Sequence, residues 1–222
     1  DLKKAVLFKD EGNIEEEVKK FNPDLIGIGP MTINYQDAIE FAEKYKKIHN
    51  TPIILGGVHI STLPTSLKPC FDVAVLGEGE LTLAQLIEFF LRGKKFDEKE
   101  LIKINGLCFK YKGKLVKTKP REPVELDTLP FPDFSFVNKD YFLEQEVPGA
   151  NTLAVKAYVL TSRSCPYKCK FCSTSHFWGK MRLHSPEYSA KLIKDSIDKY
   201  SATYINILDD LFTISVERLT SI

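Results

Sequence analysis

The sequence predicts an α/β protein, and its first ninety residues favour a parallel sheet of the Rossmann or flavodoxin type. Three observations support this fold class. Short apolar runs alternate with segments of helical periodicity over residues 1–93, two of the runs end in glycine turns, and the alternation resumes after a proline-rich stretch. Because parallel strands need crossover connections, such alternation indicates βαβ units.

The elements expected in residues 1–93 are strands at 4–8, 24–29, 52–57 and 72–80 and helices at 13–21, 35–48 and 81–93. Asn13 and Glu16 form a capping-box pattern at the first helix, and Gly93 stands where a helix C-cap belongs. The run at 24–29 is continuously apolar, which predicts a strand buried on both faces.

Residues 94–150 have a different character. A hairpin is expected at 106–118 with its turn at Lys112-Gly113, and a stretch with four prolines follows, at Pro120, Pro123, Pro130 and Pro132. Proline at this density opposes both helix and sheet, so we expect a connector at 94–150. It separates a first domain, 1–93, from a second, 151–222, in which strands at 153–163 and 202–210 flank a helix at 186–199.

Composition excludes several classes of protein. The 222 residues are 43% hydrophobic and 27% charged, with a formal net charge of +1, so no strong field indicates nucleic acid as a partner. No apolar run reaches the roughly 18 residues of a membrane span, and no signal peptide opens the chain. Five clustered cysteines without a secretory signal indicate reduced thiols in the cytoplasm. The chain begins on a strand-like run and stops within a helical pattern, so we expect a fragment.

Three cysteines lie within eight positions, in the stretch "CPYKCKFC": Cys165, Cys169 and Cys172. Soft thiolates bind soft metals, and a loop with this spacing directly after a strand can bind three irons of a [4Fe–4S] cluster. The fourth iron then stays open to a substrate or cofactor. An alternative is a Cys3His zinc site completed by His176, in a non-catalytic binding module. Cys70 and Cys108 are expected to be small core residues.

The cysteine motif resembles that of the radical S-adenosylmethionine (SAM) enzymes, with Phe171 as the aromatic residue before the last cysteine. "STSHFWGKMRLHSPE" and "INILDDLFTISVERL" resemble the subfamily that carries an N-terminal cobalamin-binding domain, as do "PIILGGVHISTLP" and "VAVLGEGELTLAQLIEFF". The resemblance covers nearly the whole chain. It implies that residues 151–222 form the first strands of a partial (βα)6 TIM-like barrel.

The resemblance also implies cofactors and contacts. Cys165, Cys169 and Cys172 would bind the cluster, whose open iron chelates SAM and whose electron releases a 5′-deoxyadenosyl radical. The family's reactions include methyl transfer, cyclisation and rearrangement. Phe171 would lie near the adenine of SAM, and Asp209 and Asp210 near its amino group. In another interpretation, one aspartate caps the next helix or pairs with Arg182. Cobalamin would lie against the glycine turns, at Gly56, Gly57, Gly77 and Gly79.

The chain departs from one cobalamin pattern. It has no Asp-x-His-x-x-Gly string, so we expect no histidine ligand beneath the cobalt; His59 is then a loop residue, and Met31 could face the corrin. In a third interpretation the N-terminal domain no longer binds cobalamin. The expected partners are a small-molecule substrate and an electron donor such as flavodoxin or ferredoxin. With only two barrel strands, residues 1–222 alone are expected to be inactive.

Overall fold

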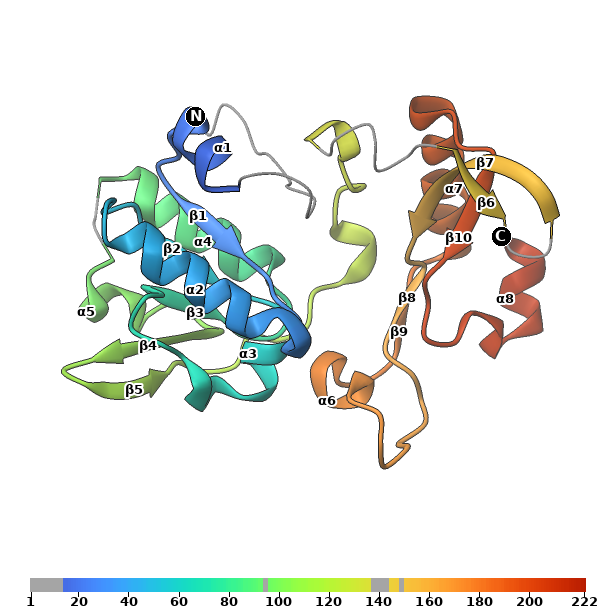
Figure 1. The fold of residues 1–222 in the computed structure, drawn as a ribbon. Coiled ribbons are helices and arrows are strands. Elements are labelled where there is room, and N and C mark those ends of the chain that lie inside the picture. Colours follow the sequence, from blue (N-terminus) through green and yellow to red (C-terminus); the bar gives the residue numbers. More distant parts are fainter. Residues whose placement is uncertain (1–13, 94–95, 137–143, 148–149) are drawn as a thin grey trace. The chain divides into compact units, whose positions relative to one another are not determined.

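The computed structural model describes residues 14–93, 96–136, 144–147 and 150–222. These residues divide between Val124 and Glu125 into two compact units, an N-terminal and a C-terminal unit, and each is described by itself (Figure 1). The predicted connector is shared between them, because its hairpin belongs to the N-terminal unit and its later prolines to the C-terminal unit. The expected strand at 4–8 and the Asn13 cap lie outside the described residues.

The N-terminal unit is built on a five-stranded sheet in the order β1-β2-β3-β4-β5. The strands are β1 (Ile26–Ile28), β2 (Ile53–Leu55), β3 (Val73–Val75), β4 (Leu107–Tyr111) and β5 (Lys114–Lys117). β1, β2 and β3 pair in parallel, whereas β4 is antiparallel to both β3 and β5. The α/β class with parallel strands is confirmed, and the predicted hairpin extends this sheet. Its turn residues Lys112 and Gly113 both have positive φ, at 48° and 76°.

Helices pack against this sheet on both faces. They are α1 (Ile14–Phe21), α2 (Tyr35–Lys46), α3 (Val58–Thr62), α4 (Glu80–Leu91) and α5 (Glu98–Leu101), with the 3-10 turns η1 (Thr32–Asn34) and η2 (Pro64–Ser66). Ile54, Val73 and Leu86 of α4 share one buried cluster. Ile53 and Leu55 point to the opposite face because side chains alternate along a strand, and they are fully buried on the side where α2 lies in Figure 1.

The expectation that 24–29 is buried on both faces is wrong. β1 covers only three residues, and its middle residue, Gly27, is exposed. Within the described sheet β1 is an edge strand with β2 as its neighbour, so one of its sides lacks a covering strand.

The C-terminal unit contains a βαβ crossover. Its strands are β6 (Glu144–Val147), β7 (Ala150–Val159), β8 (Ser162–Arg163), β9 (Arg182–Leu183) and β10 (Tyr204–Ile207). Its helices are α6 (Thr174–Trp178), α7 (Pro186–Tyr200) and α8 (Val216–Ser221), with 3-10 turns η3 (Leu126–Thr128), η4 (Phe134–Phe136) and η6 (Phe212–Ile214). β7 and β10 pair in parallel through α7, and β6 adds an antiparallel strand. The second βα alternation is therefore present; the barrel to which it would belong stays a prediction.

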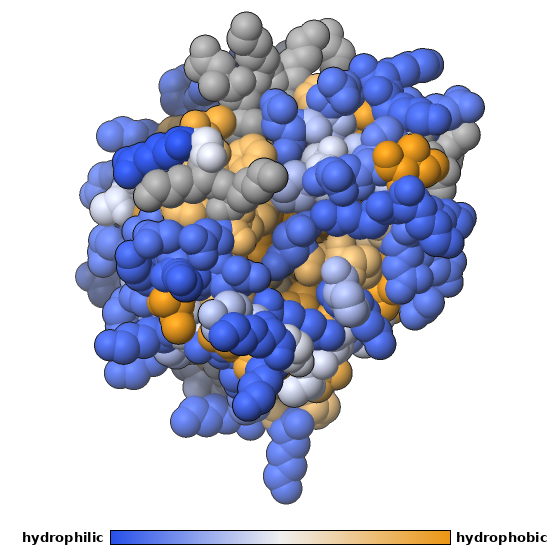
Figure 2. All heavy atoms as spheres, turned by 90° about the vertical axis from the view of Figure 1, so that its left-hand side faces the viewer, coloured by the Kyte–Doolittle hydropathy of each residue, from blue (hydrophilic) through white to orange (hydrophobic). Residues whose placement is uncertain are grey.

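The surface is that of an ordinary folded domain. On the face drawn in Figure 2, hydrophilic side chains predominate and hydrophobic ones emerge in separate places. Among the helices that the structure describes, none combines the length and the apolar character needed to cross a bilayer.

Candidate cofactor sites

The three clustered cysteines lie on a loop whose base is held together by a short hairpin. β8 and β9 pair through Ser162 with Leu183 and through Arg163 with Arg182. Ser164, fully buried with a φ of 74°, donates its hydroxyl to the Gly179 carbonyl at 2.8 Å. The loop between them is thus closed at its base and open at its tip, where the three cysteines are half-buried or exposed.

The thiols have the chemistry of metal ligands, although they are not gathered into a metal site. In the part of the chain that the structure describes, no three His, Cys, Asp or Glu side chains are arranged to hold a metal ion. Hydrogen bonds from the side chain and backbone of Thr174 hold the pKa of Cys172 below its ordinary value. Burial instead raises the pKa values of Cys70 and Cys108. Thiolates are the ligands of soft metals. The three accessible cysteines of the loop therefore fit an iron–sulfur cluster, whereas the buried Cys70 and Cys108 do not.

His176, the fourth ligand of the zinc alternative, lies on α6 and is exposed. Its backbone N–H donates to the Ser173 carbonyl at 3.0 Å, which forms part of that short helix. The structure does not bring its ring into a group with the cysteines. Phe171, predicted beside the adenine, is 94% exposed at the tip of the loop.

The two predicted aspartates differ in their surroundings. Asp209 accepts hydrogen bonds from the Thr161 N–H and hydroxyl, both at 2.6 Å, and from the Ser162 N–H at 3.1 Å. Asp210 is exposed and accepts a 3.1 Å hydrogen bond from Thr174, the residue that also contacts Cys172. Asp209 therefore holds the start of the cysteine loop, and Asp210 lies beside the loop itself.

Neither alternative role of these aspartates is seen. Ser215 caps α8, since its hydroxyl accepts from the Arg218 N–H. Arg182 instead donates to the Trp178 carbonyl at 3.4 Å. The helix-cap and Arg182 interpretations are therefore wrong for both.

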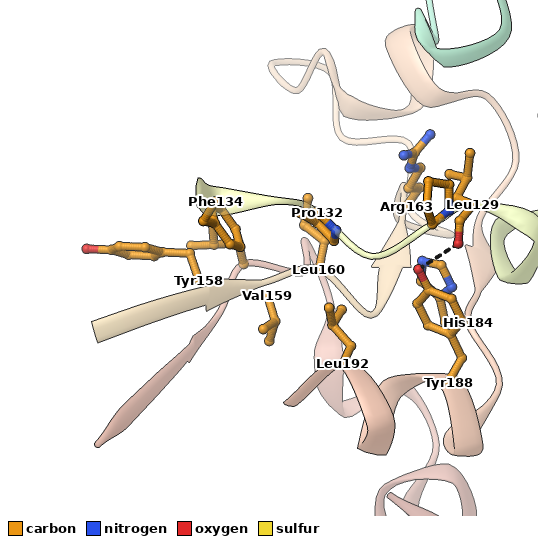
Figure 3. A pocket seen from close by; sticks show the side chains of 12 residues that line it. Leu129, Pro132, Phe134, Tyr158, Val159, Leu160, Arg163, His184, Tyr188 and Leu192 are labelled. Carbon is orange, nitrogen blue, oxygen red and sulfur yellow. Dashed lines mark hydrogen bonds between the residues drawn. The ribbon is translucent and has the colours of Figure 1, made fainter. Parts of the chain in front are cut away.

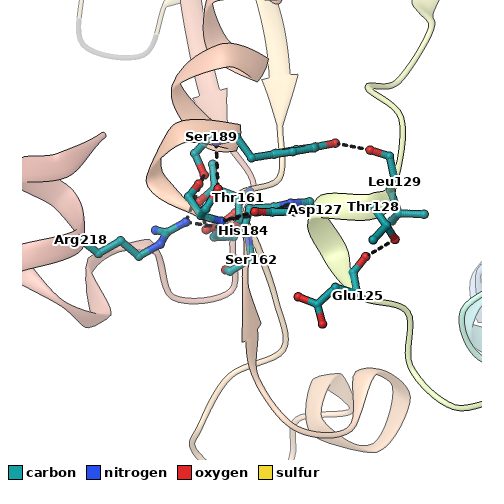
Figure 4. Close-up of polar contacts among 12 residues, drawn as sticks. Glu125, Asp127, Thr128, Leu129, Thr161, Ser162, His184, Ser189 and Arg218 are labelled. Carbon is teal, nitrogen blue, oxygen red and sulfur yellow. Dashed lines mark hydrogen bonds and ion pairs between the residues drawn. The ribbon is translucent and has the colours of Figure 1, made fainter.

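Arg218 also holds Thr161, the residue that comes just before the hairpin at the base of the cysteine loop. Its side chain is buried and donates to the Thr161 carbonyl at 2.8 Å, with the Ser189 hydroxyl at 3.4 Å (Figure 4). Thr161 is thus bound by Asp209 after β10 and by Arg218 of α8. Sequence reasoning missed both Thr161 and Arg218, because a single polar residue without a motif gives no signal.

The four predicted glycines lie at the carboxyl ends of β2 and β3. Gly57 has a φ of 88°, and a Cβ there would lie 3.2 Å from the Pro30 carbonyl oxygen. Ser61 joins the two turns, because its hydroxyl donates to the Gly57 carbonyl at 2.8 Å and accepts from the Gly77 N–H at 2.9 Å.

A Cβ built at Gly56 or Gly77 would meet no atom within 4 Å, and one at Gly79 would meet only Val75, at 3.6 Å. The turns therefore leave open space directly above the backbone. Open space at the carboxyl edge of a parallel sheet is where α/β domains bind ligands, so these turns fit a cofactor that approaches the main chain closely.

His59 lies in α3, which begins directly after Gly57, and each of its ring nitrogens lies within hydrogen-bond distance of a hydroxyl group. Nδ1 is 3.1 Å from the Thr32 hydroxyl, Nε2 is 3.2 Å from the Ser66 hydroxyl, and the ring stacks on Tyr35 at 3.9 Å between centroids. Met31, which follows β1, is 61% exposed. The histidine is thus held by the protein, while the methionine presents an apolar surface at this edge.

The fold and the two sites define a class: a cofactor-binding α/β domain followed by a βαβ unit that carries a cysteine loop. Comparison with known proteins agrees. Residues 7–87 match the B12 binding domain family. The chain is 34% identical over its whole length to an uncharacterized methyltransferase of Pyrococcus horikoshii, covering 46% of that protein. It is 27% identical over 94% of its length to cytidylyl-2-hydroxyethylphosphonate methyltransferase of Streptomyces wedmorensis, covering 43% of it.

Solved structures share the fold. The radical S-adenosylmethionine methyltransferase TsrM from Kitasatospora setae superposes with a TM-score of 0.65 at 16% identity, over 92% of this chain and 40% of that one. The cobalamin-dependent S-adenosylmethionine radical enzyme OxsB gives 0.67 at 19% identity, over 94% and 29%. The chain thus contains a B12-binding domain and is similar to radical SAM methyltransferases, and it spans less than half the length of these relatives.

Proposed function

We propose that this chain is the cofactor-binding part of a cobalamin-dependent radical SAM enzyme that transfers a methyl group to a small molecule or cyclises one. The observation that carries the proposal is the cysteine loop directly after a strand in a chain whose residues 7–87 match the B12 binding domain. Relatives named as methyltransferases support methyl transfer, and similarity to the anaerobic magnesium-protoporphyrin IX monomethyl ester cyclase of Rubrivivax gelatinosus supports cyclisation.

In this proposal Cys165, Cys169 and Cys172 bind a [4Fe–4S] cluster through three of its irons. The cluster, when bound with SAM, supplies the electron for reductive cleavage of SAM to a 5′-deoxyadenosyl radical. Asp210, one hydrogen bond from Thr174, is the better candidate of the two aspartates for contact with the SAM amino group. Asp209 holds Thr161 and Ser162, which positions the loop.

The glycine turns of the N-terminal unit would bind cobalamin, with Gly56, Gly57, Gly77 and Gly79 leaving space for it. The reduced cluster needs an external electron donor such as flavodoxin or ferredoxin. Lys168 and Lys170 are exposed on the cysteine loop, and their charge would favour the approach of a negatively charged donor.

Cobalamin binding tests the proposal and separates it from the interpretation in which the N-terminal domain has lost this cofactor. We expect the chain to retain about one hydroxocobalamin through gel filtration, in line with a single set of turns. Gly56→Trp should abolish retention, because Gly56 lacks a positive φ and a side chain there meets no atom, so the indole fills the turn without backbone strain.

Ile48→Trp is the matched control. Ile48 is 73% exposed just beyond the C-terminus of α2, which leads to the amino ends of the strands rather than to their carboxyl ends. Far-UV circular dichroism checks that both variants fold. Retention by Gly56→Trp equal to that of Ile48→Trp would contradict the assignment of the turns.

A further inference from the structure

The short helix α3 connects the segments that follow β1, β2 and β3. It begins directly after Gly57, where a Cβ would lie 3.2 Å from the Pro30 carbonyl oxygen, so the chain after β2 lies close to the end of β1. Ser61 of α3 contacts the turn after β3. His59 of α3 contacts the segment after β1, because its Nδ1 lies 3.1 Å from the Thr32 hydroxyl (Figure 1). Thr32 therefore lies at the edge that carries the glycine turns.

The partners of Ser66 determine which nitrogen of His59 carries the proton. The Ser66 hydroxyl has one hydrogen, which it donates to the Leu63 carbonyl at 2.7 Å. It therefore accepts at its other contact, from Nε2–H of His59 at 3.2 Å. In a neutral imidazole the second nitrogen is then an acceptor. Nδ1 of His59 thus accepts the hydroxyl hydrogen of Thr32.

The ring of His59 is held in plane and at its edge. It stacks on the buried Tyr35 at 3.9 Å between centroids, and the Tyr35 hydroxyl donates to the Ser66 carbonyl at 2.8 Å. Tyr35 thus fixes the plane of the ring, and Ser66 fixes the edge that carries Nε2. The direction in which Thr32 donates its hydrogen is fixed as a consequence.

Thr32 presents an acceptor to its surroundings. The residue is exposed at the start of η1, and its contact with His59 is the one side-chain hydrogen bond it makes among the described residues. A hydroxyl has one hydrogen and two lone pairs. Because the hydrogen points to His59, the lone pairs select a ligand group that donates. A carboxylate or a phosphate has no hydrogen to offer them.

We propose that the Thr32 hydroxyl, oriented by His59, accepts a hydrogen bond from a carboxamide side chain of bound cobalamin. The corrin ring carries primary carboxamides around its rim, and their N–H groups are donors. Gly56 and Gly77 leave open space at the same edge of the sheet. Thr32 is then a binding residue and His59 a positioning residue. This inference rests on the proposed binding of cobalamin at the glycine turns.

Equilibrium dialysis with hydroxocobalamin tests the hydrogen bond. Thr32→Val removes the hydroxyl at nearly constant volume and should weaken binding about five-fold, the order expected for one hydrogen bond between neutral groups. Thr32→Ser keeps the hydroxyl and, as the matched control, should bind as the wild type does. Far-UV circular dichroism checks that the variants fold. Equal affinity of the wild type and Thr32→Val would overturn this inference alone, whereas a wild type that binds no cobalamin would overturn the proposed cobalamin site with it.

The ligand's side of the bond is tested with hydroxocobalamin derivatives, each with one corrin carboxamide hydrolysed to a carboxylate. One derivative should bind the wild type more weakly than hydroxocobalamin and lose nothing further in Thr32→Val, because its carboxylate cannot donate to Thr32. Every other derivative should lose about five-fold in the variant, as hydroxocobalamin does. The same loss for all derivatives would show that Thr32 contacts no carboxamide, and would overturn the inference.

The positioning role of His59 is tested by combining variants. His59→Phe keeps a ring against Tyr35 but offers Thr32 no acceptor. It should weaken hydroxocobalamin binding about three-fold, because the hydroxyl hydrogen is then free to occupy three staggered orientations. In the Thr32→Val background the same substitution should change nothing further, whereas a general structural effect would weaken both backgrounds. Equal losses in the two backgrounds would overturn the positioning role.

Discussion

Thr161 shows how a residue without any motif can matter as much as the cysteines that follow it. Asp209 binds its N–H and hydroxyl, and Arg218 binds its carbonyl. The metal-binding role of Cys165, Cys169 and Cys172 can be predicted from the sequence, because ligands of one metal centre on a short loop need a characteristic spacing. The roles of Thr161 and Arg218 could not be predicted from the sequence, because the partners that define them lie about fifty residues away and neither residue belongs to a motif.

We predict that Asp209→Ala destabilises the C-terminal unit by about 2–4 kcal/mol, since it removes three hydrogen bonds to a carboxylate and leaves buried partners unsatisfied. Urea unfolding followed by fluorescence is the measurement, because the single tryptophan, Trp178, lies in this unit. Asp210→Ala should cost under about 0.5 kcal/mol, as is usual for an exposed side chain. Equal losses in the two variants would show that Asp209 is not the support described here.

His59 is predicted not to ligate cobalt. Both of its nitrogens lie within hydrogen-bond distance of Thr32 or Ser66, and stacking on Tyr35 fixes the ring, so ligation would break contacts that hold the histidine in place. Electron paramagnetic resonance of the cobalt(II) form should look the same for the wild type and His59→Ala. Coupling to one nitrogen nucleus that disappears in His59→Ala would show that the histidine is a ligand.

At the scale of elements, the proline-rich segment is attached to the start of α7. Asp127 of η3 accepts from His184 Nδ1 at 2.8 Å and from the Ser185 N–H at 3.2 Å. Burial raises the pKa of Asp127, but the hydrogen bonds from Ser185 and His184 outweigh it, so its pKa lies below the ordinary value. For His184, burial lowers the pKa and outweighs the opposite effect of Asp127.

The lowered pKa values of His184 and Asp127 predict that mild acid weakens the attachment of the proline-rich segment to the start of α7. An unfolded histidine binds a proton near pH ~6.5, whereas folded His184 does so only at lower pH. The unfolded state therefore holds more protons in that window, and stability falls as the pH drops from about 7.5 to about 5.5. Asp127 has the same sign, but its contribution is lost only at lower pH, as the pH falls through its depressed pKa.

The measurement is the urea midpoint of Trp178 fluorescence at pH 7.5 and pH 5.5. The decrease between the two should be smaller in His184→Phe, whatever its absolute stability. A decrease of the same size in the variant would assign the pH dependence to other groups.

At the scale of elements, long helices could be predicted from the sequence and short helices could not. The helices α2, α4 and α7 were predictable because twelve or more residues carry a clear periodicity. The helices α3 and α6 have five residues each, too few for a periodic signal, so the sequence did not reveal them. Burial of β1 was misjudged because an apolar run does not disclose its place in the strand order.

At the scale of the whole molecule, the alternation of strands and helices predicted the parallel core, and the glycine turns predicted the edge at which a ligand would approach. The sequence could not show that the hairpin β4–β5 joins the N-terminal sheet, because antiparallel pairing of β4 with β3 is a long-range contact. The boundaries at residues 93 and 150 stay a prediction. The cavity in the C-terminal unit lined by Pro132, Leu160 and Leu192 (Figure 3) was not predictable, because its walls come from four separate stretches of chain.

The cluster is the most direct test of the account. After anaerobic reconstitution, the chain should contain iron and sulfide and absorb broadly near ~400 nm, as cysteine-bound iron–sulfur clusters do. Cys165→Ala, Cys169→Ala and Cys172→Ala should each remove this absorbance, whereas Cys70→Ala and His176→Ala should keep it. A colourless protein with one zinc ion that is lost in His176→Ala would contradict the account.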